Sequence, residues 1–460
     1  MTTAARAWGR PLAAAAAAGA VAALAAGALP VWRLGLGLAL AVVVAGAVAA
    51  SGPLGAAALL ILAVYFPQGA AVGGAVISPP DVAVVLVLVA WLPAMAARGR
   101  WRVARTAGDA PWALMILAAC ISVAAGAVRG GEVPLARGLR EIGQLLLFAG
   151  LYTWAATELA APGRLRWAAG LFLAVSCAEA LYALAFQYAP SLSSIGASYV
   201  QRTTGTADAG FGAFMAAGLV MAVALGGHAS PRWRLPARAA VVCVLLAGVM
   251  STGTRGAAVA AGVGIALVLI ASRRRWVTAL TLAAALAALA MVAFWFPDLG
   301  RASRIAYRVG EPITSGGIQR MIGWRLGLDI AARHPVFGAG PGANAEAFPV
   351  LSGAPAFVID HVEGAFNAYI QALMETGPLG LLGLLAFVVL VVAAAVRAYR
   401  RAPKTPSATI GFACACGMAA VAVTGVTGPL IMAGVGHLFF LLAGLAAAGA
   451  RAAQGEADAA

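Results

Sequence analysis

The sequence predicts an all-α, polytopic integral membrane protein, on the strength of its composition, its recurring apolar runs and the placement of its arginines. Of its 460 residues, 63% are hydrophobic and 10% are charged, whereas a soluble protein carries about 25% charged residues. Lipid offers the backbone no hydrogen-bond partners, so a chain of this composition crosses the membrane as helices. We expect about 12–14 transmembrane helices, each formed by roughly 17–25 mostly apolar residues.

Apolar runs that approach this length follow one another along most of the chain. The first three are rich in alanine and weakly delimited, which is why the expected number of helices is a range. The run after Arg10 continues into further runs, so we do not expect it to be a cleavable signal. In chain order the runs are 11–29, 34–50, 54–66, 82–96, 112–128, 142–157, 167–188, 208–225, 239–252, 256–272, 276–296, 377–396, 407–426 and 430–449.

Short loops rich in arginine set the expected orientation, because loops that carry Arg and Lys stay in the cytoplasm. Both termini are then cytoplasmic. The net charge of +15 reflects topology and contact with anionic lipid, and we do not interpret it as a sign of nucleic-acid binding. The loops expected in the cytoplasm are 98–105, 164–166, 232–238, 273–275 and 397–404. The segments expected outside are 129–141, 189–207, 251–256 and 297–376.

One outer segment, 297–376, is long enough to build structure of its own. Its Pro and Gly residues separate helical patches such as 319–333. We therefore divide the chain into N-terminal transmembrane helices (1–296), this large loop region, and C-terminal transmembrane helices (377–450).

The cysteines predict neither a disulfide framework nor a metal site. All lie inside apolar runs, without a CxxC partner or a histidine at metal-ligand spacing, so we interpret them as small hydrophobic residues. No acidic metal-binding cluster stands out either, and we expect no metal ion and no cofactor. The five are Cys120, Cys177, Cys243, Cys414 and Cys416.

The stretch 360–380, DHVEGAFNAYIQALMETGPLG, is polar where its surroundings are apolar, and it leads into an expected span near Pro378. At about 100° per residue, Asn367, Gln371 and Glu375 share one helical face. The pattern predicts a short amphipathic helix at the membrane surface. Its polar face either is simply solvated or lines a site.

Arginines in the outer segments break the rule that positive charge stays inside. Arg255, in STGTRGAAVA, lies at the junction of two spans, where a charge is costly and usually functional. A guanidinium pairs with phosphate oxygens and never loses its charge, so such a cluster suits a lipid-linked diphosphate. For Arg129 and Arg137 we favour snorkelling to lipid headgroups. The outer arginines are Arg129, Arg137, Arg140, Arg202, Arg255, Arg301, Arg304, Arg308, Arg320, Arg325 and Arg333.

Two histidines have structural interpretations. His437 lies inside the last apolar run, and we interpret it as a helix–helix hydrogen bond and not as a catalyst. His334 precedes Pro335 in RHPVFGAGPG, which predicts a helix end followed by a Gly-rich turn. That turn is not a phosphate loop, because no strand precedes it and no Lys-Ser/Thr pair follows it.

Four motifs in order resemble the O-antigen ligase and O-antigen polymerase superfamily of membrane glycosyltransferases. The motifs are QRTTGT, STGTRGAAVA, QRMIGWRLGLDIAARHPVFGAGPGA and FNAYIQALMETGPLGLLG. The resemblance implies a GT-C-like fold and an enzyme that acts on undecaprenyl-diphosphate-linked glycans at the periplasmic face of the inner membrane, without a metal. Ligases of this family move a finished glycan to lipid A–core, whereas polymerases join repeat units.

The resemblance also implies site residues. Arg202 and Arg255 stand where the family's arginines hold the diphosphate, with Arg320 as a third candidate. The family's Arg-x3-Leu pattern is met here as Arg255-x3-Val259, a mild departure.

A second family motif is His-Asn/Ser/Gln, nine residues, then Gly-x-x-Gly. Asn367, Gly377 and Gly380 fit it, but Phe366 occupies the position of the histidine that acts as the proposed base in ligases. Phe366 cannot accept a proton. A base near the attacking hydroxyl is still required, and His361 or Glu363 could supply it. His361 comes first, since a histidine has a pKa of about 6.5.

These residues predict a metal-independent, inverting glycosyltransferase that moves a glycan from the polyprenyl diphosphate to an acceptor hydroxyl. Asn367, Gln371 and Glu375 would line the acceptor side. The missing motif histidine favours a polymerase or related transferase over a strict lipid A–core ligase. Two alternatives remain: a transporter or flippase for lipid-linked glycans, although no paired half-repeats are visible, and a catalytically inactive homologue. The expected partners are the donor, a glycan or lipid-glycan acceptor and membrane lipids, with no nucleic acid.

Overall fold

The structure is a computed structural model that describes residues 51–65, 70–72, 75–97, 103–188, 209–226, 234–252, 254–272, 276, 279, 282–283, 315–344, 347–353, 364–428, 430–431 and 434–458. The prediction of an all-α membrane protein is confirmed: helices dominate, and the one sheet in the described part is a hairpin of two three-residue strands. Strand β1 (Ala70–Val72) pairs antiparallel with β2 (Ala75–Ile77), with Ala71 opposite Val76.

The helices follow the predicted apolar runs in order. After a helix over Ser51–Val64 come α3 (Pro79–Ala97), α4 (Asp109–Arg129), α5 (Leu135–Glu158), α6 (Pro162–Tyr188), α8 (Ala209–Gly226), α9 (Arg234–Ser251), α10 (Arg255–Ala271), α14 (Ser315–Arg333), α15 (Phe348–Ser352), α17 (Ala368–Arg401), α18 (Pro406–Thr424) and α19 (Val435–Asp458).

Six of the described helices are long and apolar enough to cross a membrane: α3, α4, α6, α17, α18 and α19. Shorter apolar helices cover Ser51–Val64, α8, α9 and α10. Helix α5 begins with the polar residues Arg137, Arg140 and Glu141 and continues over the predicted run 142–157. The first two predicted runs, and most of 276–296, lie outside the described residues.

The last predicted run was misplaced. Residues 430–449 are apolar except for His437, yet α19 begins only at Val435 and continues to Asp458. Gly434, with φ of 84°, lies in the left-handed region just before the helix, and its backbone N–H donates to Nδ1 of His437 at 3.2 Å. Apolar composition could not show that part of the run is a turn.

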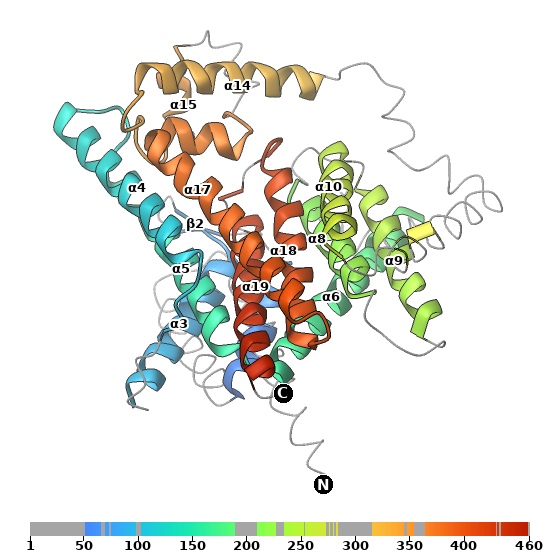
Figure 1. Ribbon diagram of the computed structural model, residues 1–460. Coiled ribbons are helices and arrows are strands. Elements are labelled where there is room, and N and C mark those ends of the chain that lie inside the picture. The colour runs from blue at the N-terminus through green and yellow to red at the C-terminus, as the bar shows by residue number, and fades with distance from the viewer. Residues whose placement is uncertain are drawn as a thin grey trace, which may run out of the picture.

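Helices α18 and α19 form the centre of the bundle (Figure 1), and most of their residues are buried. Glycine allows them to approach closely: a β-carbon on Gly449 would lie 2.4 Å from the Cα of Gly411. Close backbone approach at small residues is how membrane helices gain packing energy. Cys414 and Cys416 are fully buried here as free thiols, which confirms their interpretation as small hydrophobic residues.

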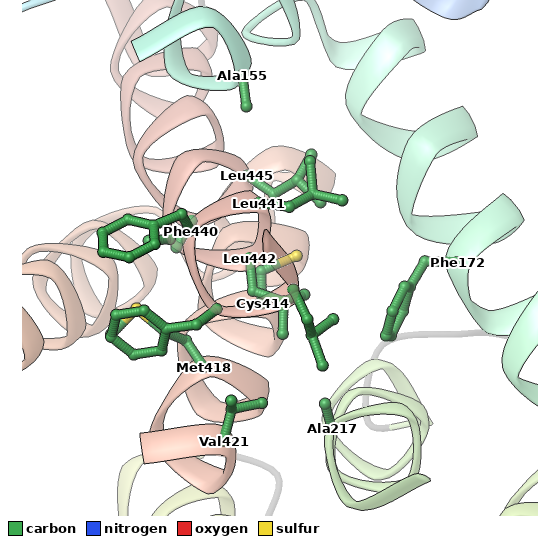
Figure 2. Close-up of a cluster of buried hydrophobic side chains, with 14 of the residues drawn as sticks. Ala155, Phe172, Ala217, Cys414, Met418, Val421, Phe440, Leu441, Leu442 and Leu445 are labelled. Atoms are coloured by element: carbon green, nitrogen blue, oxygen red, sulfur yellow. The ribbon is translucent and has the colours of Figure 1, made fainter. Parts of the chain in front are cut away.

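Figure 2 shows how side chains from the surrounding helices meet this central pair. Ala155 of α5, Phe172 of α6 and Ala217 of α8 converge on Cys414 and Leu441, and all five are buried. The aromatic and aliphatic side chains fill the space that the small residues leave, so the bundle is held by packing around its last two helices.

A second layer lies across one end of the bundle (Figure 1), formed by α14, α15 and the first turns of α17. It has its own apolar cluster, in which Ile330, Phe348 and Met374 are buried. All three come from the part of the chain predicted to be the large outer loop region, together with the start of α17. The domain boundaries and the side of the membrane on which this layer lies stay predictions.

Candidate functional site

The α18–α19 connection brings two distant motifs together. The backbone N–H of Ala368, the first residue of α17, donates to the carbonyl of Gly425 at 2.8 Å. At the start of α10, a β-carbon on Gly256 would lie 2.6 Å from Oγ1 of Thr427. One connection therefore contacts the first turns of both helices, and it places the motif around Arg255 and the motif around Asn367 on its two sides.

Arg255 is the first residue of α10, and its side chain is exposed. Thr254 is the N-cap residue and has extended backbone, but its hydroxyl makes no capping hydrogen bond; it lies 3.0 Å from Oγ1 of Thr252. The first N–H groups of a helix and its positive dipole end favour an anion. A guanidinium beside such a helix start is an arrangement that can bind phosphate oxygens.

Asn367 is the N-cap of α17. Its buried side chain accepts hydrogen bonds from the backbone N–H of Tyr369 at 2.9 Å and of Ile370 at 3.1 Å. An N-cap needs extended backbone before the helix, and Asn367 has φ of −151°. Its amide oxygen thus serves the helix start, and a substrate would have to meet the amide nitrogen.

Phe366, which stands in the position of the family's histidine, has φ of 47°. This left-handed conformation is rare for a bulky side chain and costs of order 1–3 kcal/mol. The ring is half-buried against the apolar cluster of the second layer, and that burial offsets part of the cost.

The predicted amphipathic helix is present at the start of α17, and its polar residues contact protein: Asn367 is buried, and Gln371 and Glu375 are half-buried. One carboxylate oxygen of Glu375 accepts from the backbone N–H of Gly342 at 3.1 Å and of Asn344 at 3.0 Å. The other accepts from Nε2 of Gln371 at 3.2 Å. The Glu375 carboxylate therefore holds the Gly-rich turn, and the half-buried Gln371 side chain supports it through the hydrogen bond from its amide nitrogen.

The Gly-rich turn predicted after His334 is present. Helix α14 ends at Arg333, and Gly338, Gly340 and Gly342 all have positive φ. Ala339 N–H donates to the carbonyl of Met374 at 2.7 Å, and Gly340 N–H donates to that of Glu375 at 3.1 Å. The turn is fastened at the point where α17 breaks: Gly377 has φ of 70°, and Pro378 follows it.

The structure describes only one of the remaining predicted site residues, Arg320. Arg320 is half-buried on α14, in the second layer. Arg202, His361 and Glu363 lie outside the described residues, so their roles stay predictions.

A buried polar network around Asp81 was missed from the sequence. Asp81, at the start of α3, accepts hydrogen bonds from Ser78 and from Nε2 of Gln144 on α5, the latter at 2.8 Å. Nε2 of the fully buried His437 on α19 lies 3.2 Å from the same carboxylate. This contact links α3 and α19, but Nε2 of His437 makes no hydrogen bond there. The interpretation of His437 is therefore borne out as a contact between helices and not as a helix–helix hydrogen bond. The reciprocal bonds of Ser78 and Asp81 form a capping box, and the spacing SPPD is the signal that could have revealed it.

The tautomer of His437 follows from its two neighbours. Its Nδ1 accepts from Gly434 N–H, so the proton belongs on Nε2, facing Asp81. Among the residues that the structure describes, no three His, Cys, Asp or Glu side chains are grouped as a metal ion would require.

Comparison with known families agrees with the motifs. Residues 239–388 match the model of the family described as O-antigen ligase. The matched segment runs from α9 into α17, so it holds both Arg255 and Asn367. The resemblance to O-antigen ligases and polymerases is thereby confirmed over this segment. No curated protein matches the chain.

Proposed function

Because the chain is a multi-pass membrane protein whose residues 239–388 match the O-antigen ligase family, we propose that it transfers a glycan from undecaprenyl diphosphate to an acceptor hydroxyl. The reaction takes place at the periplasmic face of the bacterial inner membrane. One observation carries this proposal. The connection between α18 and α19 contacts the first turn of α10, which begins at Arg255, and the first turn of α17, which Asn367 caps. This contact supports a single site that combines an arginine suited to a diphosphate with the acceptor motif.

On the donor side, Arg255 and the first turn of α10 bind the diphosphate, and Arg202 and Arg320 add further guanidinium groups. These charges stabilise the leaving group as its bond to the sugar breaks. Stabilising charge where it develops is the largest contribution in many transfer reactions. No metal ion is needed in this scheme, since the arginines supply the positive charge.

On the acceptor side, His361 or Glu363 takes the proton of the attacking hydroxyl. The hydroxyl oxygen forms a bond to the anomeric carbon, and the bond to the diphosphate oxygen breaks, with its electron pair leaving on the diphosphate. Direct attack from the opposite face inverts the anomeric configuration. Asn367 and Gln371 orient the acceptor through their amide groups.

Within this family we favour the polymerase, in which the acceptor is the end of another repeat unit, over the lipid A–core ligase. The reason is Phe366, which replaces the histidine that ligases use. The same substitution motivates one rival, a catalytically inactive homologue. The other rival, a transporter of lipid-linked glycans, would explain the spans and the arginines without any base. Turnover by the purified protein separates the proposal from both.

The test compares surface glycans from a strain that lacks the protein, a strain with Arg255→Ala and one with Arg129→Ala. Arg129 is the control because it is also an outer arginine, is exposed, and binds the carbonyl of Ala125 on its own helix. Single repeats on the final anchor in the first two strains indicate a polymerase, and long glycans retained on the carrier indicate a ligase. A normal glycan profile without the protein contradicts the proposal.

A further inference from the structure

We propose that Glu375 is a positioning residue, whose carboxylate fixes the Gly-rich turn 338–344 and, through Asn344, the backbone at 364–367. This inference rests on the proposed function, because it concerns the segment that joins the proposed bases at 361 and 363 to the acceptor helix α17. It assigns Glu375 a role different from the one expected from the sequence, where it was to line the acceptor side.

The carboxylate is held by three donors. Two are backbone N–H groups from one turn, those of Gly342 and Asn344, at 3.1 and 3.0 Å, and the third is the amide of Gln371 at 3.2 Å. These hydrogen bonds tie the Glu375 side chain on α17 to the backbone of the turn. A carboxyl group with this many protein donors is suited to hold the turn.

Asn344 links the Glu375 carboxylate to the backbone at 364–367 through two hydrogen bonds. Its N–H donates to Glu375, and its side-chain Oδ1 accepts from the N–H of Ala365 at 2.7 Å. A β-carbon on Gly364 would lie 2.9 Å from the carbonyl oxygen of Asn344, so the two strands of chain are in direct contact. Ala365 is followed by Phe366 in its left-handed conformation and then by the cap Asn367.

The turn has little freedom on its other side. Gly342 has φ of 95°, and a β-carbon there would lie 2.6 Å from Cγ of Arg137. Arg137 in turn forms an ion pair with Glu141 at 3.0 Å. Gly342 is therefore enclosed between the Arg137 side chain and the Glu375 carboxylate, and the removal of either contact widens the space around the turn.

Other contacts keep the near end of the turn in place without the carboxylate. Ala339 and Gly340 bind the carbonyls of Met374 and Glu375, and Oγ of Ser122 donates to the Glu375 carbonyl at 2.7 Å. None of these bonds uses the Glu375 side chain. We therefore expect Glu375→Ala to loosen 342–344 and 364–367 while the helices stay folded, so that the effect is on kcat and not on the amount of folded protein.

Glu375→Gln separates positioning from acid–base catalysis. The amide oxygen of the new side chain can accept from both backbone N–H groups, and the Gln371 amide can turn to present its oxygen to the new amide nitrogen. The Glu375→Gln side chain can therefore still hold the turn. It cannot accept a proton, because an amide has no basic oxygen near neutral pH.

The experiment measures kcat, KM, the pH profile and the melting temperature of the full-length protein in lipid nanodiscs, with undecaprenyl-diphosphate-linked glycan as donor. The variants are Glu375→Ala, Glu375→Gln, Asn344→Ala and their Ala/Ala combination. Glu158→Gln is the matched control, since that carboxylate binds Trp91 and Arg164 at the other end of α5. Hydrogen exchange at 342–344 and 364–367 is followed in each.

We expect Glu375→Ala and Asn344→Ala to lower kcat by about ten- to a hundredfold, the range for small misplacements of reacting groups, with faster hydrogen exchange in both segments. The double variant should be no worse than the more impaired single variant, because the two substitutions interrupt the same series of contacts, from Glu375 through Asn344 to Ala365. Glu375→Gln should recover most of the lost kcat with an unshifted pH profile. If it is as inactive as Glu375→Ala, or if exchange at 364–367 is unchanged in Glu375→Ala and Asn344→Ala, the inference is wrong.

The two proposals can fail separately. If the unaltered protein transfers no glycan, the proposed function fails, and the exchange data still decide whether Glu375 holds the two segments. If Glu375→Ala does not fold, Asn344→Ala carries the test, because it removes the bond to Ala365 and leaves the carboxylate with its donors.

Discussion

At the scale of single residues, Asn367 combines two roles that substitution can separate. Its oxygen caps α17, and its amide nitrogen is the part proposed to meet the acceptor. We expect Asn367→Ala to lower the free energy of unfolding by about 1 kcal/mol, the usual cost of a lost cap. Asn367→Asp should restore that stability, since Asp is an equally good cap, but not the activity. Equal activity of the Asp variant and the unaltered protein would remove Asn367 from the acceptor site.

His334 makes the stability of the second layer dependent on pH. Partial burial lowers its pKa below 6.5, and the charges of Arg129 and Arg333 lower it further, while Glu132 opposes them. The folded state therefore disfavours the protonated ring. Its contribution to stability is complete above about pH 6.5 and decreases as the pH falls through the lower pKa of the folded state.

The matching experiment records the melting temperature of the purified protein and of His334→Gln between pH 8 and pH 5. The unaltered protein should lose more stability on acidification than the variant does. Parallel curves for the two proteins would show that His334 does not titrate differently in the folded and unfolded states.

Residue types indicated some of these roles and concealed others. An arginine at a span junction pointed to Arg255, and the structure indeed places its helix start beside the connection that also contacts α17. The polar face of 360–380 was visible too, but the sequence could not show that a turn more than thirty positions earlier supplies its donors. Backbone N–H groups of a Gly-rich loop leave no signature in the pattern of side chains.

At the scale of elements, the break in α17 depends on Gly377. With φ of 70°, it lies in the left-handed region, and an added β-carbon would lie 2.3 Å from the carbonyl oxygen of Val336. We expect Gly377→Ala to destabilise the protein by at least about 2 kcal/mol, from backbone strain and collision together. Gly126→Ala, in α4, is the control: nothing lies within 4 Å of the added carbon, so that variant should be neutral or slightly stabilising. The test measures the melting temperatures of both variants by thermal unfolding. Equal melting temperatures would contradict the prediction.

The ends of helices were predictable where an apolar run stops at charged residues or at Gly and Pro, and they were not predictable elsewhere. The amphipathic helix was expected to reach a span near Pro378, and α17 does so through the break at Gly377. The start of α19 was expected too early, because the residues before Val435 are as apolar as the helix itself. Only the backbone geometry of Gly434 distinguishes them.

At the scale of the whole molecule, the Asp81 network joins three helices that are distant in the sequence, α3, α5 and α19. We expect Asp81→Ala to lower the free energy of unfolding by about 2 kcal/mol, because it leaves the amide donor of Gln144 without its acceptor and removes the carboxylate that lies 3.2 Å from Nε2 of His437. In the Asp81→Ala protein, the further substitution His437→Ala should lower the free energy of unfolding by less than it does in the unaltered protein. Strict additivity of the two substitutions in a double-mutant cycle would show that the pair is not coupled.

The central position of α18 and α19 also bears on the order in which the protein is made. A ribosome releases helices into the membrane in sequence, so α5, α6, α8 and α10 are inserted before the hairpin that they will surround exists. Until α19 emerges, the faces that later enclose Cys414 and Leu441 are exposed to lipid or to one another, and the unfinished bundle is open to membrane proteases and chaperones. The bundle around α18 and α19 is therefore complete only when both helices have been inserted, and a defect confined to these two helices would reduce the yield of every helix made before them.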